Sequence, residues 1–219
     1  MPLHLLGISR RGDLTEADCH QIRWVVHGAL TAATVWPLTA SFGPLQHGHV
    51  LAAIHRRIGI LPVRHGTVLP NEEAVQEFLG SRCQDLLRDL DRLEGTAEIG
   101  LRIELPHSPL PAEPFAPVGP CRADVSPVAY MAARRARYQQ RDRLGTQADL
   151  AADTCIQSLG GLSRDWRRLS PTAPGIVRLA FLVERNRTEA FAQRVEILRT
   201  KNIGGRYALV GPWPPYSFV

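Results

Sequence analysis

Six prolines crowd a fifteen-residue segment near the middle of the chain, and they restrict its fold more than any other feature. Residues 106–120 read PHSPLPAEPFAPVGP, and four of these prolines recur at every third position, the repeat of a polyproline II helix. Proline lacks a backbone N–H and fixes φ, so the segment is neither a helix interior nor a central strand. We therefore predict a semi-rigid linker over 106–120 between two domains, 1–105 and 121–219. Recognition by a PxxP-binding partner is the alternative.

The rest of the 219-residue chain has the composition of a folded protein, with 44% hydrophobic and 21% charged residues. Its four cysteines lie at least 34 residues apart, so no pair has the short spacing of a zinc site or a thiol redox motif. Residues 24–55 contain no Asp, Glu, Lys or Arg, but they include prolines and four histidines, unlike a membrane-spanning helix. We interpret the chain as cytoplasmic, without metal or cofactor, and residues 24–55 as core, with an apolar binding surface as the alternative.

Hydrophobic periodicity before the linker predicts a mixture of strands and helices. Six apolar residues between positions 75 and 93 repeat at steps of three and four, which is typical of one long amphipathic helix over 72–93. Asn71 precedes it as an N-cap, and Glu72 and Glu73 suit the positive end of its dipole. We also expect a helix over 45–58. The predicted strands are residues 3–8, 22–27, 29–36, 61–67 and 97–105.

The chain after the linker has the same mixed character. We expect helices over 125–144 and 147–159, with Gly160 and Gly161 ending the second, and a strand over 176–184. Asn186 with Glu189 three residues later resembles a capping box for another helix. A last strand, 207–210, leads into an extended tail, 211–219. Without regular β-α-β alternation, the α+β class fits better than a doubly wound sheet.

Charge divides unevenly between the two halves. Residues 1–120 carry 10 arginines against 13 acids, whereas residues 121–219 carry 15 arginines and one lysine against 8 acids. Five of these arginines fall between positions 134 and 143, and Arg134, Arg137 and Arg141 share one face of the expected helix. Such a face is either ordinary solvated surface or a docking site for acidic protein or phosphate, because guanidinium groups pair with both.

No catalytic signature is recognisable in the sequence, so we do not predict an enzyme. Phosphate-binding loops, dinucleotide fingerprints, nucleophile elbows and zinc-protease motifs are all missing. His47 and His49 are the nearest approach to a ligand pair, but at a spacing of two they diverge on a helix. Residues 205–210 faintly resemble an RNA-binding strand, although the aromatic residues needed for stacking are missing. An arginine-rich RNA-binding module is therefore the alternative function, and nucleic acid is not the expected partner.

The tail 211–219 combines three prolines with Trp213, Tyr216 and Phe218. The prolines prevent it from forming a helix or a central strand. Since these rings are too apolar to be left in water, we expect at least Trp213 to pack back onto the C-terminal domain. The alternative is an exposed aromatic hook that grips a partner.

Three blocks of sequence resemble the gas vesicle GvpF/GvpL family. The terminal GPWPPYSF matches the family's closing signature, residues 61–67 (LPVRHGT) resemble its LPxRFGT block with His65 in place of Phe, and residues 129–134 (AYMAAR) resemble its YLxxR helix start. The resemblance implies a two-domain α+β protein with a ferredoxin-like C-terminal domain over 121–219 and no cofactor. It also implies a minor gas vesicle component or assembly factor that binds the major shell protein GvpA and prevents its aggregation. Candidate partner-binding residues are Arg134, Arg137, Arg141, Trp213, Tyr216 and Phe218.

Overall fold

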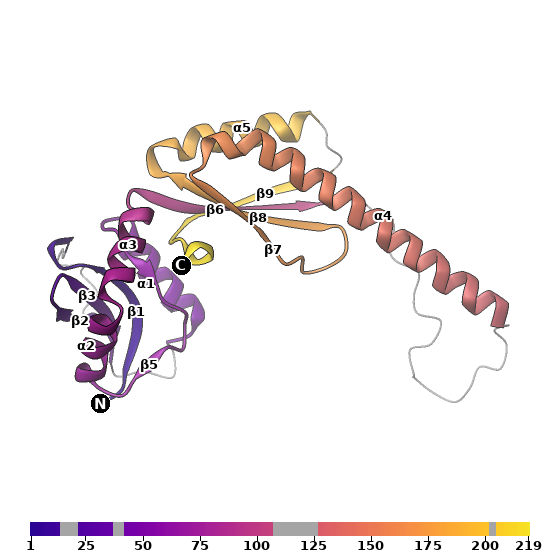
Figure 1. The fold of residues 1–219 in the computed structure, drawn as a ribbon. Coiled ribbons are helices and arrows are strands. Elements are labelled where there is room, and N and C mark those ends of the chain that lie inside the picture. The colour runs from indigo at the N-terminus through magenta and orange to yellow at the C-terminus, as the bar shows by residue number, and fades with distance from the viewer. Residues whose placement is uncertain (14–21, 37–41, 107–126, 202–204) are drawn as a thin grey trace. The chain divides into compact units, whose positions relative to one another are not determined.

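The computed structural model describes residues 1–13, 22–36, 42–106, 127–201 and 205–219 (Figure 1). It contains two compact units, and each is made of segments that are separated in the sequence. The first comprises Met1–Ile99, Leu182–Thr188 and Val210–Val219, and the second comprises Gly100–Phe181 and Glu189–Leu209. This division differs from the predicted domains 1–105 and 121–219, because late segments of the chain belong to the first unit. All of the predicted linker except Pro106 lies outside the described residues.

The first unit is built on an antiparallel sheet with the order β2-β3-β1-β4, in which β5 also pairs with β1. Its strands are β1 (Leu3–Arg10), β2 (Ile22–His27), β3 (Leu30–Val35), β4 (Leu61–Pro62) and β5 (Val68–Leu69). Strand β1 is central and buried along nearly its whole length, which explains its apolar sequence. The single strand predicted over 61–67 is wrong in its extent, since β4 and β5 are separated by a turn in which Gly66 has φ of +91°.

Three helices accompany this sheet: α1 (Pro44–His55), α2 (Glu72–Ser81) and α3 (Cys83–Leu93). Asn71 caps α2 as predicted, with its Oδ1 accepting a hydrogen bond from the Ala74 N–H at 2.9 Å. The prediction of one helix over 72–93 is wrong, because the backbone leaves the helical region at Arg82 (φ −117°, ψ 15°). The apolar spacing continues across this break, so the two helices still present their buried leucines to the core.

The second sheet has the order β7-β8-β6-β9. Its elements follow the chain as β6 (Thr96–Glu104), α4 (Pro127–Leu159), β7 (Asp165–Leu169), β8 (Ile176–Glu184), α5 (Thr188–Thr200) and β9 (Arg206–Trp213). This β-α-β-β-α-β succession with that strand order is the ferredoxin-like arrangement, and α4 and α5 lie on one face of the sheet (Figure 1). The α+β class is therefore confirmed. The motif begins with β6, ahead of the proline-rich segment.

Helix α4 is continuous, so the prediction of two helices over 125–144 and 147–159 is wrong. Its buried residues all lie in its C-terminal half: Leu144, Ala152, Cys155 and Leu159 are at most 4% exposed, and none of the residues 128–143 is buried. The N-terminal half extends beyond the sheet (Figure 1). Across the described residues, no helix is both long and apolar enough to cross a membrane.

Strand β9 runs three residues further than predicted, through Pro212 to Trp213. It can do so because it is an edge strand, where a missing N–H breaks no ladder hydrogen bond. Four short 3₁₀ segments complete the described elements: Arg11–Asp13, Gly160–Leu162, Arg185–Arg187 and Tyr216–Phe218.

Replacing Gly7 by Ala should destabilise the first unit. A Cβ at Gly7 would lie 2.7 Å from the Leu61 carbonyl oxygen and 2.8 Å from the Ile60 side chain, so β1 or β4 would have to shift. We expect a loss of about 1–3 kcal/mol in the free energy of unfolding, measured by urea denaturation. Gly48→Ala in α1 is the control, because its Cβ would meet nothing within 4 Å and alanine favours helix. Equal stability of the two variants would contradict this account of Gly7.

Candidate partner-binding site

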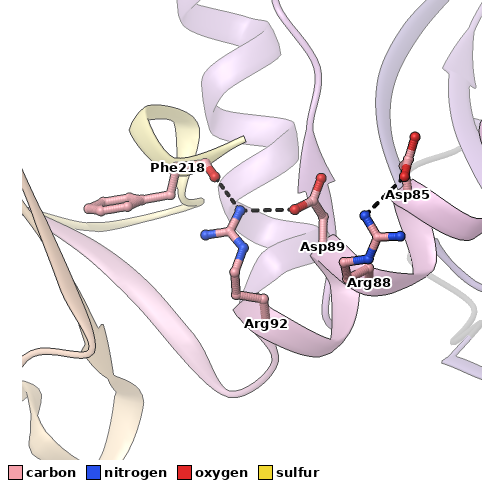
Figure 2. Close-up of polar contacts among 5 residues, drawn as sticks. All are labelled: Asp85, Arg88, Asp89, Arg92 and Phe218. Carbon is pink, nitrogen blue, oxygen red and sulfur yellow. Dashed lines mark hydrogen bonds and ion pairs between the residues drawn. The ribbon is translucent and has the colours of Figure 1, made fainter.

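The last residues of the chain are anchored to the first unit by a buried ring and by hydrogen bonds. Phe218 is 2% exposed, and Pro214 and Pro215 are buried with it. Figure 2 shows Arg92 on α3 donating to the Phe218 carbonyl oxygen at 2.5 Å while it pairs with Asp89 at 3.0 Å. The tail is therefore held by α3 through a charged donor, which makes stronger hydrogen bonds than a neutral one.

A second anchor comes from Glu98 on β6. One carboxylate oxygen accepts from the Ser217 N–H and the other from the Ser217 hydroxyl, each at 2.7 Å. A single carboxylate thus satisfies both donors of Ser217 and fixes the turn at Tyr216–Phe218. Both anchors bind Ser217 or Phe218, so they hold residues 211–215 from the C-terminal side.

The other two aromatic rings of the tail are partly exposed. Trp213 is 42% exposed and Tyr216 is 40% exposed. Phe218 is therefore the fully buried ring of the tail, whereas Trp213, which we expected to pack, is only partly covered; by contacts the tail belongs to the first unit. Partial burial, and secondly the Glu98 carboxylate, raises the pKa of Tyr216 to about 12, so its hydroxyl is neutral at physiological pH.

The arginine candidates lie on the N-terminal half of α4. Arg134 and Arg141 are exposed and Arg137 is half-buried. The guanidinium of Arg134 lies 5.6 Å from the ring centroid of Tyr138 and donates to its hydroxyl at 3.3 Å. These residues belong to the second unit and the tail aromatics to the first. Three of the six candidates are therefore arginines of the second unit and three are aromatic residues of the first, of which Phe218 is buried.

Sequence reasoning missed a buried pair of histidines in the first unit. His4 Nε2 lies 3.1 Å from His47 Nδ1, and His47 Nε2 lies 3.0 Å from the Val63 carbonyl oxygen. Since a carbonyl only accepts, His47 donates from Nε2 and accepts at Nδ1, which makes His4 the donor to it. The ring of His65 lies 5.1 Å from that of His4. Among the described residues, no group of three or more His, Cys, Asp or Glu side chains is placed to hold a metal ion.

Arg185 makes a third polar centre, which ties the end of α1 to β6. Its guanidinium donates to the His55 carbonyl oxygen, to the Arg56 carbonyl oxygen at 3.4 Å and to the Thr96 carbonyl oxygen at 3.3 Å. The same group lies 3.1 Å from His55 Nδ1. Because a guanidinium cannot accept, the histidine nitrogen that it contacts must carry a lone pair, and His55 is neutral.

Acid should destabilise the first unit through these histidines. Burial first, then the charges of His47 and His65, lowers the pKa of His4 to about 4; burial first, then Arg185, lowers that of His55 to about 4. The unfolded chain takes up these protons near pH 6.5, so between 6.5 and 4 it binds more protons than the folded chain, and stability falls as pH falls. At pH 5 each of the two histidines should lower the free energy of unfolding by roughly 2 kcal/mol relative to pH 8.

Urea denaturation from pH 8 to pH 5 measures this dependence. His55→Gln should flatten the stability curve, whereas His49→Gln, at an exposed position of α1, should leave its slope unchanged. If the stability of the His55→Gln variant depends on pH as that of the unchanged protein does, His55 does not cause the loss of stability in acid.

Phe218→Ala should weaken the anchoring of the tail. We expect the free energy of unfolding to fall by about 3 kcal/mol. This is the low end for deleting a buried Phe, because a terminal segment can detach instead of leaving a cavity. Val219→Ala is the control: Val219 is 57% exposed, so this substitution should change the free energy of unfolding little. Limited proteolysis of the C-terminus with equal rates in both variants would show that Phe218 does not hold the tail.

Comparison with known proteins places this architecture in a family. Residues 13–219 match the family described as gas vesicle synthesis protein GvpL/GvpF. Two similar proteins come from Streptomyces sp. (strain CB03234). Gas vesicle protein L is 28% identical over 182 residues, which covers 79% of this chain and 67% of that protein. Gas vesicle protein F is 28% identical over 211 residues, which covers 90% of this chain and 87% of that protein.

Two solved structures share the fold. Gas vesicle protein GvpF from Microcystis aeruginosa superposes with a TM-score of 0.72 at 17% identity, covering 99% of this chain and 98% of the other. GvpF from Anabaena sp. PCC7120 gives 0.73 at 18% identity, covering 99% and 95%. The family match over nearly the whole sequence, with the terminal aromatic segment included in it, shows that this chain belongs to the GvpL/GvpF family of gas vesicle proteins.

Proposed function

We propose that this protein is a gas vesicle assembly factor or minor vesicle component that binds the major shell protein GvpA and prevents its aggregation while the vesicle nucleates. Family membership supplies the gas vesicle role. A shell subunit that forms a gas-facing wall exposes a large apolar surface before assembly, and such surfaces associate unless a partner covers them. A protein that covers them needs apolar groups of its own at its surface.

The observation that carries the proposal is the anchored aromatic tail. Trp213 and Tyr216 are about two-fifths exposed, while the same short segment is fixed by buried Phe218. Exposed Trp and Tyr are the residues that most often dominate binding energy at protein interfaces. Because the segment is already ordered, its side chains lose less conformational entropy on binding than those of a free tail. The tail is thus suited to hold an apolar partner.

The uncharged stretch 24–55 supplies less to such a surface. Its strands and the inner face of α1 form core with Leu6, including Ala33, Leu51 and Ile54. Among its described residues, Trp36 and Leu45 expose large apolar side chains, by 44% and 80%. We therefore assign the tail as the principal contact with the shell protein.

Co-expression with GvpA tests the proposal. The unchanged protein should keep GvpA in the soluble fraction, and pull-down in 0.5 M salt should recover both, because apolar contacts are not screened by salt. A Trp213→Ser/Tyr216→Ser double variant should lose most of this effect without unfolding, since both rings are already partly exposed. Trp166→Ser is a matched control, because Trp166 is 43% exposed on β7.

Two results would overturn the proposal. The first is GvpA that aggregates equally with and without the unchanged protein. The second is recovery of nucleic acid in place of GvpA, lost as salt rises, which is the behaviour of phosphate binding.

A further inference from the structure

A pocket of about 350 Å³ lies in the second unit between α4 and the turn that joins β7 to β8. Its charged lining consists of Arg141, Arg168, Arg178 and Asp149. Small and apolar residues of α4 and the turn, such as Gly145 and Ala148, complete it. Three guanidinium groups against one carboxylate leave an excess of positive charge around a partly apolar hollow.

The pocket already contains one carboxylate that is paired with an arginine. Asp149 on α4 pairs with Arg168 on β7, and both groups remain open to solvent, with 63% and 42% of their side chains exposed. Arg178 on β8 is directed to the turn, where it donates to the Ser170 carbonyl oxygen at 3.3 Å. Neither Arg141 nor Arg178 has a carboxylate partner among the ion pairs of the described residues. An incoming anion would therefore find two guanidinium groups available.

Gly145 keeps the floor of this pocket open. It lies one helical turn after Arg141 and one turn before Asp149, so all three share a face of α4. Glycine inside a helix costs about 1 kcal/mol relative to alanine. A Cβ at Gly145 would meet nothing within 4 Å, so packing within the chain does not require glycine there. The absence of a side chain instead leaves the hollow accessible between the two charged residues.

We propose that this pocket binds a carboxylate side chain within an acidic segment of a partner protein, with Arg141 and Arg178 as its cationic ligands. Guanidinium groups match carboxylate geometry. Asp149 disfavours a doubly charged phosphate more than a singly charged carboxylate, and the described lining includes no aromatic ring for base stacking. The apolar lining residues suit the aliphatic parts of a peptide. This site uses none of the residues of the tail and does not depend on the shell-protein role.

Fluorescence anisotropy with a labelled peptide of alternating leucine and glutamate tests the site at low salt. The same peptide with glutamine in place of glutamate and a single-stranded oligonucleotide of equal length serve as comparison probes. We expect the glutamate peptide to bind most tightly of the three, and Arg141→Glu to weaken it by about tenfold or more through charge repulsion. Arg135→Glu is the matched control, because it makes the same charge change on the same helix outside the pocket.

Two further variants distinguish an effect on peptide binding from an effect on folding. Gly145→Met should fill the pocket and abolish peptide binding while thermal stability is kept or raised, because methionine favours helix. Asp149→Asn should strengthen binding by removing the competing carboxylate. Equal losses for Arg135→Glu and Arg141→Glu, a glutamine peptide that binds as well as the glutamate peptide, or tighter binding of the oligonucleotide would each overturn the proposal.

Discussion

The guanidinium of Arg185 holds together parts of the first unit that are far apart in sequence. It follows β8, yet it donates to carbonyl oxygens at the end of α1 and at the start of β6. The C-terminus of a helix carries unpaired carbonyls and partial negative charge, so a cation that donates several hydrogen bonds there is well matched. Burial lowers the pKa of Arg185, but the group remains cationic at physiological pH. Neutral His55 is a condition of this arrangement, which links the α1–β6 junction to pH.

The two candidate surfaces depend on different forces. Trp213 and Tyr216 offer apolar area on a segment ordered by Phe218, and such contacts persist at high salt. Arg141 and its neighbours offer charge around a small hollow, and contacts between exposed charges weaken as salt increases. The two proposed contacts therefore use different side chains and should respond differently to salt.

Features encoded by neighbouring residues could be predicted from the sequence. The Asn71 cap and the strand over 176–184 follow from local side-chain chemistry and periodicity, and the closing GPWPPYSF identified the family. Strand β7 was missed because its sequence, DWRRL, is polar and mostly exposed. The periodicity predicted two helices, 125–144 and 147–159, although burial of Leu144 and Ala148 on either side of the gap accompanies one continuous α4. The contacts of His4 with His47, of Arg185 with His55 and of Arg92 with Phe218 join distant positions, and no local pattern reports them.

The division of the chain has a consequence for the order in which the units can form during synthesis. The first unit includes Leu182–Thr188 and Val210–Val219, so its first ninety-nine residues lack part of their native contacts until those later segments have been synthesised. The second unit is also interrupted, but its last segment ends at Leu209. A chain that stops before Val210 therefore lacks both the last segment of the first unit and the side chains of Trp213 and Tyr216.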